Sequence, residues 1–220
     1  MLPLHLSQSP STPLQLLFLG AHCDDIEIGC GGTILQLLAM RGDIEVTWVV
    51  FSASQVREQE ARRSASLFLQ QAQQSTKVII HNFRDGHFPY QGAEIKHCFE
   101  TLKNECNPDL IFTHYRQDRH QDHRTISDLT WNTWRRHLIL EYEIPKYDGD
   151  LGQPNFFSPL SKDICERKAR TICDVFRSEA NKAWMSEDTF MALARLRGIE
   201  SAAPGNHAEA FYCRKLVLSL

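Results

Sequence analysis

The sequence predicts an α/β fold in which a doubly wound, mostly parallel sheet lies between helices, in three layers. Short, continuous apolar runs alternate along the chain with helical patterns, and such runs are typical of strands buried on both faces of a parallel sheet. In addition, two of these runs end in clusters of histidine and aspartate, at the position where open α/β sheets bind ligands.

The predicted elements of the first half begin with a strand at residues 14–20, LQLLFLG, and a glycine-rich turn at residues 29–33 that starts a helix. Residues 45–54 are a second buried strand, and an amphipathic helix follows over residues 55–72. KVIIHNF is a third strand, which ends at a turn formed by Arg84-Asp85-Gly86. Strands that alternate with helices in this way are typical of a parallel sheet, in which a helix connects each strand to the next.

The fourth strand, DLIFTH at residues 109–114, follows a helix predicted over residues 93–106. Another helical pattern comes after it, with apolar residues at Ile126, Leu129 and Trp134. Right-handed crossovers and the strand order 3-2-1-4 place the reversal of the sheet between the first and the fourth strand. Because both polar clusters follow these two strands, we expect the clusters to line one crevice.

Toward the C-terminus the pattern is weaker. LILEYEIPKY is predicted to include another strand. Residues 148–161 are predicted to form a long, turn-rich loop in which Phe156 and Phe157 are buried anchors rather than lid or subunit contacts. Helices are predicted over residues 161–179 and 186–197, and FYCRKLVLSL is a last, β-like segment.

The first polar cluster consists of His22, Asp24 and Asp25. A nucleotide-binding turn is one interpretation, because glycines between a strand and a helix can let a phosphate approach the helix N-terminus. However, the segment GCGGT lacks the G-x-G-x-x-G spacing, and the two carboxylates would repel a phosphate. A metal site is the alternative, since imidazole and carboxylate are ligands for zinc and similar divalent ions.

The second cluster consists of Asp118, His120, Asp122 and His123, and it occupies the same position between a strand and a helix. A solvated loop rich in histidine and aspartate would explain either cluster alone. Two such clusters at equivalent ends of two strands favour a shared site that binds a metal ion.

With these two motifs the chain resembles the LmbE/PIG-L type zinc-dependent N-acetylglucosaminyl deacetylases. The first family motif, A-H-P-D-D followed by a glycine-rich turn, corresponds to AHCDD at residues 21–25 and GCGGT at residues 29–33. The second, H-x-D-H, corresponds to HQDH at residues 120–123. The chain departs from the family at Cys23, which replaces a proline, and at Ile26, which replaces the commoner glutamate. Weaker similarities extend the resemblance over nearly the whole chain, at Arg57-x-x-Glu60, Asp85-Gly86 and Ala208–Phe211.

The resemblance implies a Rossmann-like, LmbE-like fold and one Zn²⁺ per chain, or another divalent metal, bound by His22, Asp25 and His123. Two imidazoles and one carboxylate leave a position for water, whose pKa a bound metal ion lowers toward neutrality. Cys23 would be a fourth ligand if its thiolate reached the metal, although four protein ligands would displace that water.

Four further residues receive roles in this hypothesis. Asp24 is our candidate for the base that takes a proton from the water, and His120 for the group that assists the oxyanion or the leaving amine. Asp122 is expected to hold the His120 ring and to raise its basicity. Arg57 could form an ordinary ion pair with Glu60 within one helix; the resemblance implies instead that Arg57 reaches a substrate hydroxyl.

The reaction that this assignment predicts is hydrolysis of the acetamide of an N-acetylglucosamine-type amino sugar or its conjugate, with release of acetate and a free amine. Three alternatives stay open: a zinc amidase for a non-sugar or differently acylated amine, a nucleotide-binding domain, and a non-catalytic metal-binding protein. Asp24 and His120 argue against the last, because neither is needed merely to hold a metal. The sequence does not identify the aglycone, that is, the group attached to the amino sugar.

Length and composition fit a single domain over residues 1–220 with a sizeable core, including a loose N-terminal arm at residues 1–13. The net charge of −3, without a basic block, indicates neither nucleic acid nor a membrane surface as a partner, and no apolar run reaches a membrane-spanning length. The arm lacks the features of a signal peptide, and the seven scattered cysteines suggest reduced thiols. We therefore expect a cytoplasmic enzyme with a small-molecule substrate, and the resemblance suggests a homo-oligomer.

Overall fold

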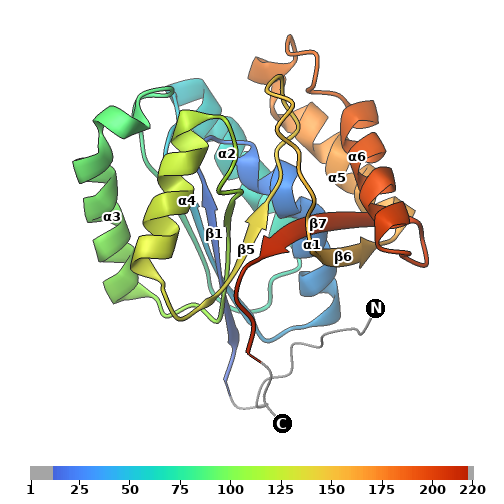
Figure 1. Ribbon diagram of the computed structural model, residues 1–220, viewed down its shortest axis with the longest axis horizontal. Helices are drawn as coiled ribbons and strands as arrows, with labels where there is room; N and C mark the ends of the chain where they lie inside the picture. Colours follow the sequence, from blue (N-terminus) through green and yellow to red (C-terminus); the bar gives the residue numbers. More distant parts are fainter. Residues whose placement is uncertain (1–11, 218–220) are drawn as a thin grey trace.

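A computed structural model describes residues 12–217, so that most of the predicted N-terminal arm lies outside the described residues. Seven strands form one sheet in the order β3-β2-β1-β4-β5-β7-β6 (Figure 1). The strands β1 to β5 are parallel, and β7 is antiparallel to both of its neighbours, which confirms a mostly parallel sheet. The strands are β1 (Leu14–Gly20), β2 (Ile44–Val50), β3 (Thr76–Ile80), β4 (Leu110–His114), β5 (Leu138–Tyr142), β6 (Phe156–Leu160) and β7 (His207–Cys213).

Helices cover both faces of the sheet and give the three predicted layers (Figure 1). The helices on one face are α1 (Asp25–Met40), α2 (Gln55–Phe68) and α5 (Lys162–Val175), and those on the other are α3 (Gly92–Glu105) and α4 (Gln121–Thr133). The last helix, which packs against α5 and β7, is α6 (Glu187–Glu200). Two short 3₁₀ helices are η1 (Phe88–Tyr90) and η2 (Arg177–Glu179).

Strand β1 lies in the middle of the sheet and supplies both halves of the core. Its side chains alternate between the two faces, as a strand buried on both sides requires. Leu16 and Phe18 pack with residues of α1, α2 and α5, whereas Leu17 and Leu19 pack with residues of α3 and α4. The continuous apolar run that predicted this strand therefore reflects two separate hydrophobic layers.

The predicted strand order is confirmed at the point where the sheet reverses. β1 pairs in parallel with β2 on one side and with β4 on the other, with Phe18 opposite Phe112. Both β1 and β4 therefore end at the same edge of the sheet, and the two polar clusters that follow them lie next to each other.

The glycine-rich segment does not form a turn, and this prediction is wrong. Helix α1 begins earlier, at Asp25, and runs through the glycines. The glycines serve close packing: a Cβ added at Gly29 would lie 2.2 Å from a ring carbon of Tyr142 on β5, and one added at Gly32 would lie 2.5 Å from a methyl carbon of Leu160 on β6. Glycine thus lets the helix backbone approach the sheet more closely than any other residue would.

The predicted loop at residues 148–161 is wrong at its end, because Phe156–Leu160 forms the edge strand β6. Pro159 obscured this strand in the sequence, yet proline is tolerated at a sheet edge, where its missing N–H is not needed. Phe156 is partly buried against the core, as expected of an anchor. Two boundaries also differ, because β7 begins at His207, before the predicted segment, and α2 ends at Phe68.

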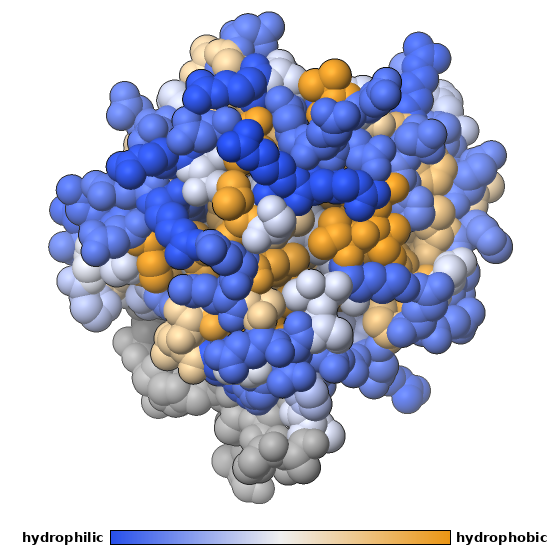
Figure 2. Space-filling model, turned by 180° about the vertical axis from the view of Figure 1, so that it is seen from behind, coloured by the Kyte–Doolittle hydropathy of each residue, from blue (hydrophilic) through white to orange (hydrophobic). Residues whose placement is uncertain are grey.

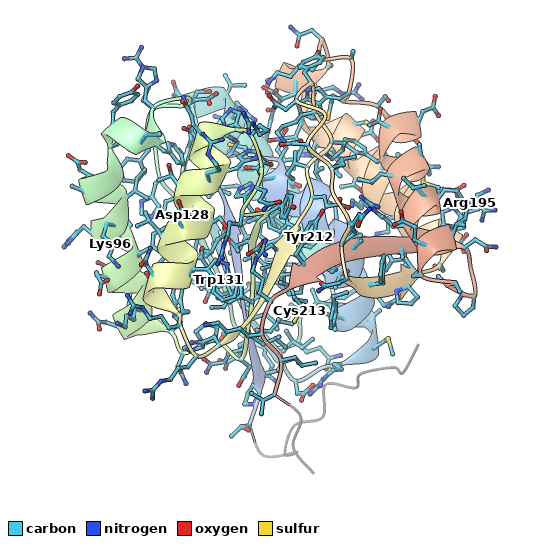
Figure 3. The ribbon with its side chains drawn as sticks, in the orientation of Figure 1. Lys96, Asp128, Trp131, Arg195, Tyr212 and Cys213 are labelled. Atoms are coloured by element: carbon cyan, nitrogen blue, oxygen red, sulfur yellow. The ribbon has the colours of Figure 1, made fainter. Side chains whose placement is uncertain are left out.

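The buried carboxylate of Glu141 on β5 fastens α4 and the segment after β7 to the sheet. It accepts hydrogen bonds from Trp131 Nε1 at 2.7 Å and from Arg214 Nε at 2.6 Å. Tyr212, the partner of Glu141 across the β5–β7 pair, lies on the same face of the sheet as Trp131 (Figure 3). These contacts hold the antiparallel strand β7 against the parallel part of the sheet.

The outer surface is largely polar. On the face opposite to that of Figure 1, hydrophilic residues cover most of the area and hydrophobic ones gather in patches near its centre (Figure 2). Within residues 12–217, no helix combines the length and the apolar character needed to cross a membrane. All seven cysteines lie in this part of the chain and are free thiols.

Candidate active site

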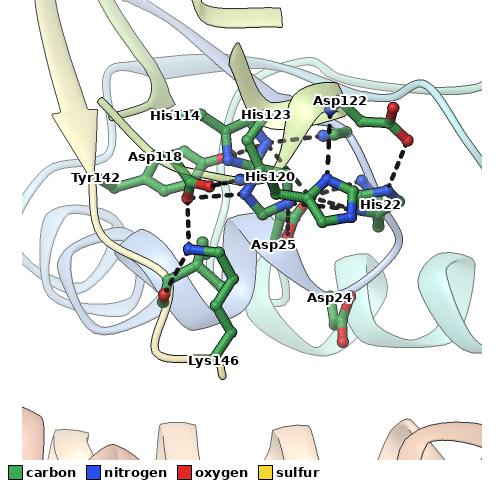
Figure 4. Close-up of polar contacts among 12 residues, drawn as sticks. His22, Asp24, Asp25, His114, Asp118, His120, Asp122, His123, Tyr142 and Lys146 are labelled. Carbon is green, nitrogen blue, oxygen red and sulfur yellow. Dashed lines mark hydrogen bonds and ion pairs between the residues drawn. The ribbon is translucent and has the colours of Figure 1, made fainter. Parts of the chain in front are cut away.

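The two polar clusters meet at the carboxyl ends of β1 and β4 (Figure 4). His22 follows β1 in the turn before α1, and Asp25 is the first residue of α1. His123 lies in the first turn of α4, which follows β4. All three side chains are almost fully buried, with exposed fractions of 8%, 3% and 3%. They line a cleft of about 630 Å³, its open mouth included, together with Asp24, Arg57 and His120.

The side-chain donor atoms of His22, Asp25 and His123, the predicted metal ligands, face one another. Nδ1 of His22 lies 3.2 Å from Nε2 of His123 and 3.3 Å from Oδ2 of Asp25. Nε2 of His123 lies 3.4 Å from Oδ1 of Asp25. Two ligand atoms that each lie about 2.1 Å from a tetrahedral ion are about 3.4 Å apart. The donor set therefore fits a zinc-like divalent ion, and these three side chains could hold it.

Two other histidines lie close to the same atoms, but one nitrogen of each is already engaged. His114, at the end of β4, accepts a hydrogen bond at Nε2 from the backbone N–H of Ala21 at 2.9 Å. His120 is the N-cap of α4, and its Nδ1 accepts from the backbone N–H of Asp122 at 3.3 Å. Burial lowers the pKa of His114 to about 4, so this ring stays neutral. Three groups of side chains within residues 12–217 bring donor atoms close enough for one metal ion: His22 with His120 and His123, Asp25 with His114 and His123, and His22 with Asp85 and Asp122. Each group contains at least one predicted ligand, and the set of His22, Asp25 and His123 stays a prediction.

Carboxylates orient both imidazole rings of the predicted ligand set. Oδ2 of Asp118 lies 2.9 Å from Nδ1 of His123, which leaves Nε2 of that ring to face the cluster. Nε2 of His22 lies 3.1 Å from Asp85 and 3.3 Å from Asp122, which leaves Nδ1 of that ring to face the cluster. Histidines that bind metals usually have such a partner on the other nitrogen, because it fixes the tautomer and the ring orientation.

The contact of Asp122 differs from the predicted one. We expected its carboxylate to hold His120, but only the backbone N–H of Asp122 reaches that ring. The carboxylate instead accepts hydrogen bonds from the backbone N–H groups of Gly86 at 2.6 Å and Phe88 at 3.0 Å, besides its contact with His22. The first turn of α4 directs Asp122 toward the segment before η1, where its carboxylate contacts both that segment and His22.

The electrostatics of the cluster suit a bound cation. Burial favours the neutral ring of His22, yet the carboxylates around it, first of all Asp25, raise its pKa well above the usual value. Burial also disfavours the charged form of Asp25, yet the histidines around it, first of all His123, hold its pKa well below the usual value. The cluster thus stabilises positive charge beside a carboxylate that stays ionised, as a metal site must.

Asp24 lies apart from the histidines (Figure 4). Its Oδ1 accepts a hydrogen bond from Arg57 at 3.0 Å, whereas its Oδ2 is buried and has no hydrogen-bond partner among residues 12–217. Burial raises the pKa of Asp24, and the nearby guanidinium of Arg57 opposes that shift. Asp24 lines the cleft, and a carboxylate with a raised pKa is suited to take up a proton.

Arg57 does not pair with Glu60, so the ordinary ion pair is not formed. Its guanidinium contacts Asp24 and, at 3.6 Å, the carboxylate of Glu179. Glu60 instead accepts hydrogen bonds from the backbone N–H and the hydroxyl of Ser178. Arg57 therefore lies in the wall of the cleft, where a substrate could reach it.

The thiol of Cys23 does not point toward the metal ligands. Its Sγ donates a hydrogen bond to the backbone carbonyl of Ser52 at 3.3 Å. Burial raises the pKa of this thiol, so that it stays protonated and is a poor ligand. These observations favour the simple replacement of a proline over a fourth ligand.

Three further residues near the predicted ligands are Asp118, Lys146 and His114, to which the sequence patterns assign no role. Asp118 belongs to the second cluster. Histidines that bind metals usually have a carboxylate partner, and this rule could have predicted the contact of Asp118 with His123. Lys146 lies far along the chain and gave no signal; its Nζ lies 3.0 Å from Asp118 and 2.6 Å from Asp150. His114 closes the strand DLIFTH and reaches the cluster only because that strand is central.

A family model and a bacterial protein match this chain. The family model described as PIG-L, GlcNAc-PI de-N-acetylase, matches residues 17–134 and so contains all three predicted ligands. The uncharacterized deacetylase YaiS of Escherichia coli (strain K12) is 32% identical over 144 residues, which cover 59% of this chain and 74% of YaiS.

Solved structures of proteins with different reactions share the fold. The N,N'-diacetylchitobiose deacetylase of Pyrococcus horikoshii, 23% identical, matches with a TM-score of 0.71 over 91% of this chain and 83% of its own. The 4-carboxy-2-hydroxymuconate hydratase GalB of Pseudomonas putida KT2440, 13% identical, matches with a TM-score of 0.69 over 94% of this chain and 99% of the GalB chain. The fold alone therefore does not determine the reaction. The family match does identify the lineage: this chain belongs to the PIG-L (LmbE-like) family.

Proposed function

We propose that this chain is a zinc-dependent hydrolase that removes the N-acetyl group from an N-acetylglucosamine-type amino sugar or its conjugate. One observation carries the proposal. The side chains of His22, Asp25 and His123 bring donor atoms within 3.2 to 3.4 Å of one another, with a different oxygen of Asp25 facing each histidine. They line the same cleft as Asp24, whose Oδ2 has no hydrogen-bond partner within the described chain. Membership of the PIG-L family and the deacetylase name of YaiS support the same reaction.

The imidazoles of His22 and His123 and the carboxylate of Asp25 would hold the ion. A divalent ion bound there supplies Lewis acidity, which polarises a carbonyl oxygen and makes a water molecule more acidic. The contacts of His123 with Asp118 and of His22 with Asp122 keep both rings in the required orientation.

Asp24 acts as the base. Its Oδ2 takes a proton from the water molecule whose oxygen forms a bond with the acetamide carbonyl carbon. Arg57 binds the other oxygen, Oδ1, and so fixes the direction of the carboxylate. The bond between carbonyl carbon and nitrogen then breaks, and the nitrogen gains the proton that Asp24 took from the water, which yields acetate and the free amine and restores the Asp24 carboxylate. N–H groups of Arg57 that face the cleft bind a substrate hydroxyl.

His120 supplies a hydrogen-bond donor. Because its Nδ1 accepts from the backbone N–H of Asp122, the neutral ring carries its hydrogen on Nε2. Burial, together with the nearby His123, lowers the pKa of His120, so that the neutral ring predominates near pH 7. Nε2–H is then suited to donate to the carbonyl oxygen as negative charge develops on it.

The test is acetate release from a panel of N-acetylglucosaminides and of N-acylated amines that are not sugars, with the metal content measured on the same sample. We expect acetate from the sugar substrates only, in protein that contains a divalent metal. Hydrolysis restricted to the non-sugar amines would favour an amidase of different specificity. Tight nucleotide binding that survives metal removal, without any hydrolysis, would contradict the proposal.

A further inference from the structure

The cleft extends beyond the predicted metal ligands, and its outer wall comes from two connections far apart in the sequence. Ile144 to Asp148 belong to the connection between β5 and β6, and Glu179 to Trp184 belong to the connection between α5 and α6. Both connections reach the upper end of the molecule in Figure 1. The backbone N–H of Ala183 donates a hydrogen bond to the hydroxyl of Tyr147 at 3.1 Å, which joins them.

Two aromatic side chains stand in this outer wall. The Tyr147 side chain has an exposed fraction of 72%, an unusual position for a large aromatic residue whose hydroxyl is already bonded. Trp184 is half-buried, packs against the edge of the core, and carries Lys182 Nζ at 5.5 Å from its ring centre. An exposed ring in a cleft offers a flat apolar surface against which the C–H face of a sugar ring can pack.

The charges of the cleft disfavour an anionic aglycone. Each of the three cationic side chains that line it already has a carboxylate partner: Arg57 pairs with Asp24 and Glu179, Lys146 with Asp118 and Asp150, and Lys182 with Glu179. The cleft is also lined by five carboxylates, Asp24, Asp25, Asp85, Asp148 and Glu179. A phosphate would therefore find no unpaired cation in the cleft, where the carboxylates outnumber the lysine and arginine side chains.

We infer that the outer half of the cleft is a subsite for an uncharged sugar ring, glycosidically linked to the amino sugar and packed against Tyr147, and not for a phosphate. This inference rests on the proposed function, since it names the aglycone of the same substrate. It makes Tyr147 a specificity residue that acts on the second ring, whereas the acetamide lies at the predicted metal ligands.

The experiment compares N,N'-diacetylchitobiose, N-acetylglucosamine and N-acetylglucosamine 1-phosphate as substrates of the zinc-loaded protein. We expect kcat/KM to be highest for the disaccharide and lowest for the phosphate. Tyr147→Ala should lower kcat/KM for the disaccharide about fivefold to tenfold more than for the monosaccharide, as expected for one lost aromatic contact. Tyr90→Ala is the matched control, because Tyr90 is an exposed tyrosine that does not line the cleft.

Binding of the disaccharide, measured by calorimetry on the same variants, separates this inference from the proposed function. If N-acetylglucosamine is deacetylated but the disaccharide neither reacts better nor binds through Tyr147, the subsite is refuted and the function stands. If nothing is deacetylated but the disaccharide binds and Tyr147→Ala weakens that binding about fivefold or more, the subsite stands and the function is refuted. Faster turnover of the phosphate than of the monosaccharide would also overturn the inference.

Discussion

Asp24 and Asp25 are adjacent and chemically identical, yet the fold gives their side chains different surroundings. Asp25 opens α1 and faces His22 and His123, whose charges hold its pKa well below the usual value. Asp24 turns toward Arg57 and keeps one oxygen without a partner inside the described chain, and burial raises its pKa. The two residues can therefore have different tasks, one as a metal ligand and one as a base.

Substitution of these two residues tests that division. Asp24→Asn keeps the size of the side chain but cannot take up the proton of the water, so kcat should fall about 10²- to 10⁴-fold while the metal content stays near one per chain. Asp25→Ala removes a charged ligand, so the metal content itself should fall and activity with it. Metal analysis and steady-state kinetics on the same samples check both. If Asp24→Asn loses metal and Asp25→Ala keeps it, the assignments are reversed.

Cys23 provides a second test at the scale of single residues. Because its thiol bonds to the carbonyl of Ser52 and stays protonated, Cys23→Ala should leave zinc affinity and turnover close to those of the unmodified protein. Zinc affinity can be measured by competition with a chromogenic chelator. A drop of more than about tenfold, the size expected when a residue that supports a metal is lost, would show that the sulfur contributes to the site.

Helix α1 carries the site and is held unusually close to the sheet. The glycines within it leave room for the Tyr142 ring and for Leu160, and the Glu209 carboxylate on β7 accepts hydrogen bonds from the backbone N–H groups of Gly32 and Thr33, both at 2.7 Å. This packing fixes the position of the N-terminus of α1, and therefore of Asp25, relative to β4 and β5.

Gly29→Ala tests the close approach of α1. A Cβ there would lie 2.2 Å from the Tyr142 ring, so we expect a loss of about 1–3 kcal/mol in the free energy of unfolding, despite the higher helix propensity of alanine. Gly92→Ala is the control: Gly92 begins α3, nothing lies within 4 Å of its added Cβ, and stability should change by no more than about 0.5 kcal/mol. Urea denaturation of both variants measures the difference. Equal effects in the two variants would contradict the packing role of Gly29.

The same helix shows what the sequence could predict and what it could not. The apolar runs and the position of the polar clusters predicted β1, β4 and their adjacency, because those features depend on local pattern and chain topology. The sequence predicts a turn at the glycines of α1, because the reason for them lies in Tyr142 and Leu160, which are distant in the sequence. Likewise, the carboxylate of Asp122 reaches His22 across the chain, a contact that residue spacing alone could not reveal.

At the scale of the whole molecule, the topology assembles the site from segments that lie far apart in the sequence. His22 and Asp25 follow β1, Asp118 to His123 follow β4, and Lys146 follows β5, all at one edge of the sheet. The sequence predicted the first two contributions because each carried a dense motif. It could not predict the third, because a single lysine beyond β5 carries no pattern that distinguishes it from a surface lysine.

The charge of this assembled site links metal binding to pH and to global stability. In the metal-free protein the carboxylates raise the pKa of His22 and of His123 above the usual value, although burial opposes both shifts. Protonation of these rings thus stabilises the fold fully below about pH 6.5, the pKa of histidine in the unfolded chain. This contribution is lost as the pH rises through the pKa values of the two rings in the folded protein. Zinc must displace the same protons, so its affinity falls as the pH falls.

We therefore predict that the increase in Tm on addition of excess zinc is larger at pH 8 than at pH 6. Thermal denaturation of metal-free and zinc-loaded protein at both pH values measures it, at one protein and one zinc concentration, because the shift depends on both. An increase that is equal at the two pH values, or larger at pH 6, would show that protons and zinc do not compete for these side chains.

The most direct test of the central claim is a zinc titration of the metal-free protein with acetate release as the readout. The claim is that one ion, held by His22, Asp25 and His123, is required for hydrolysis of an N-acetylated amino sugar. We predict no acetate release from the metal-free protein and a rise in rate that levels off at one zinc per chain. Acetate release at full rate from protein that contains no divalent metal would contradict the claim, and so would a zinc-loaded protein that hydrolyses no N-acetylated amino sugar.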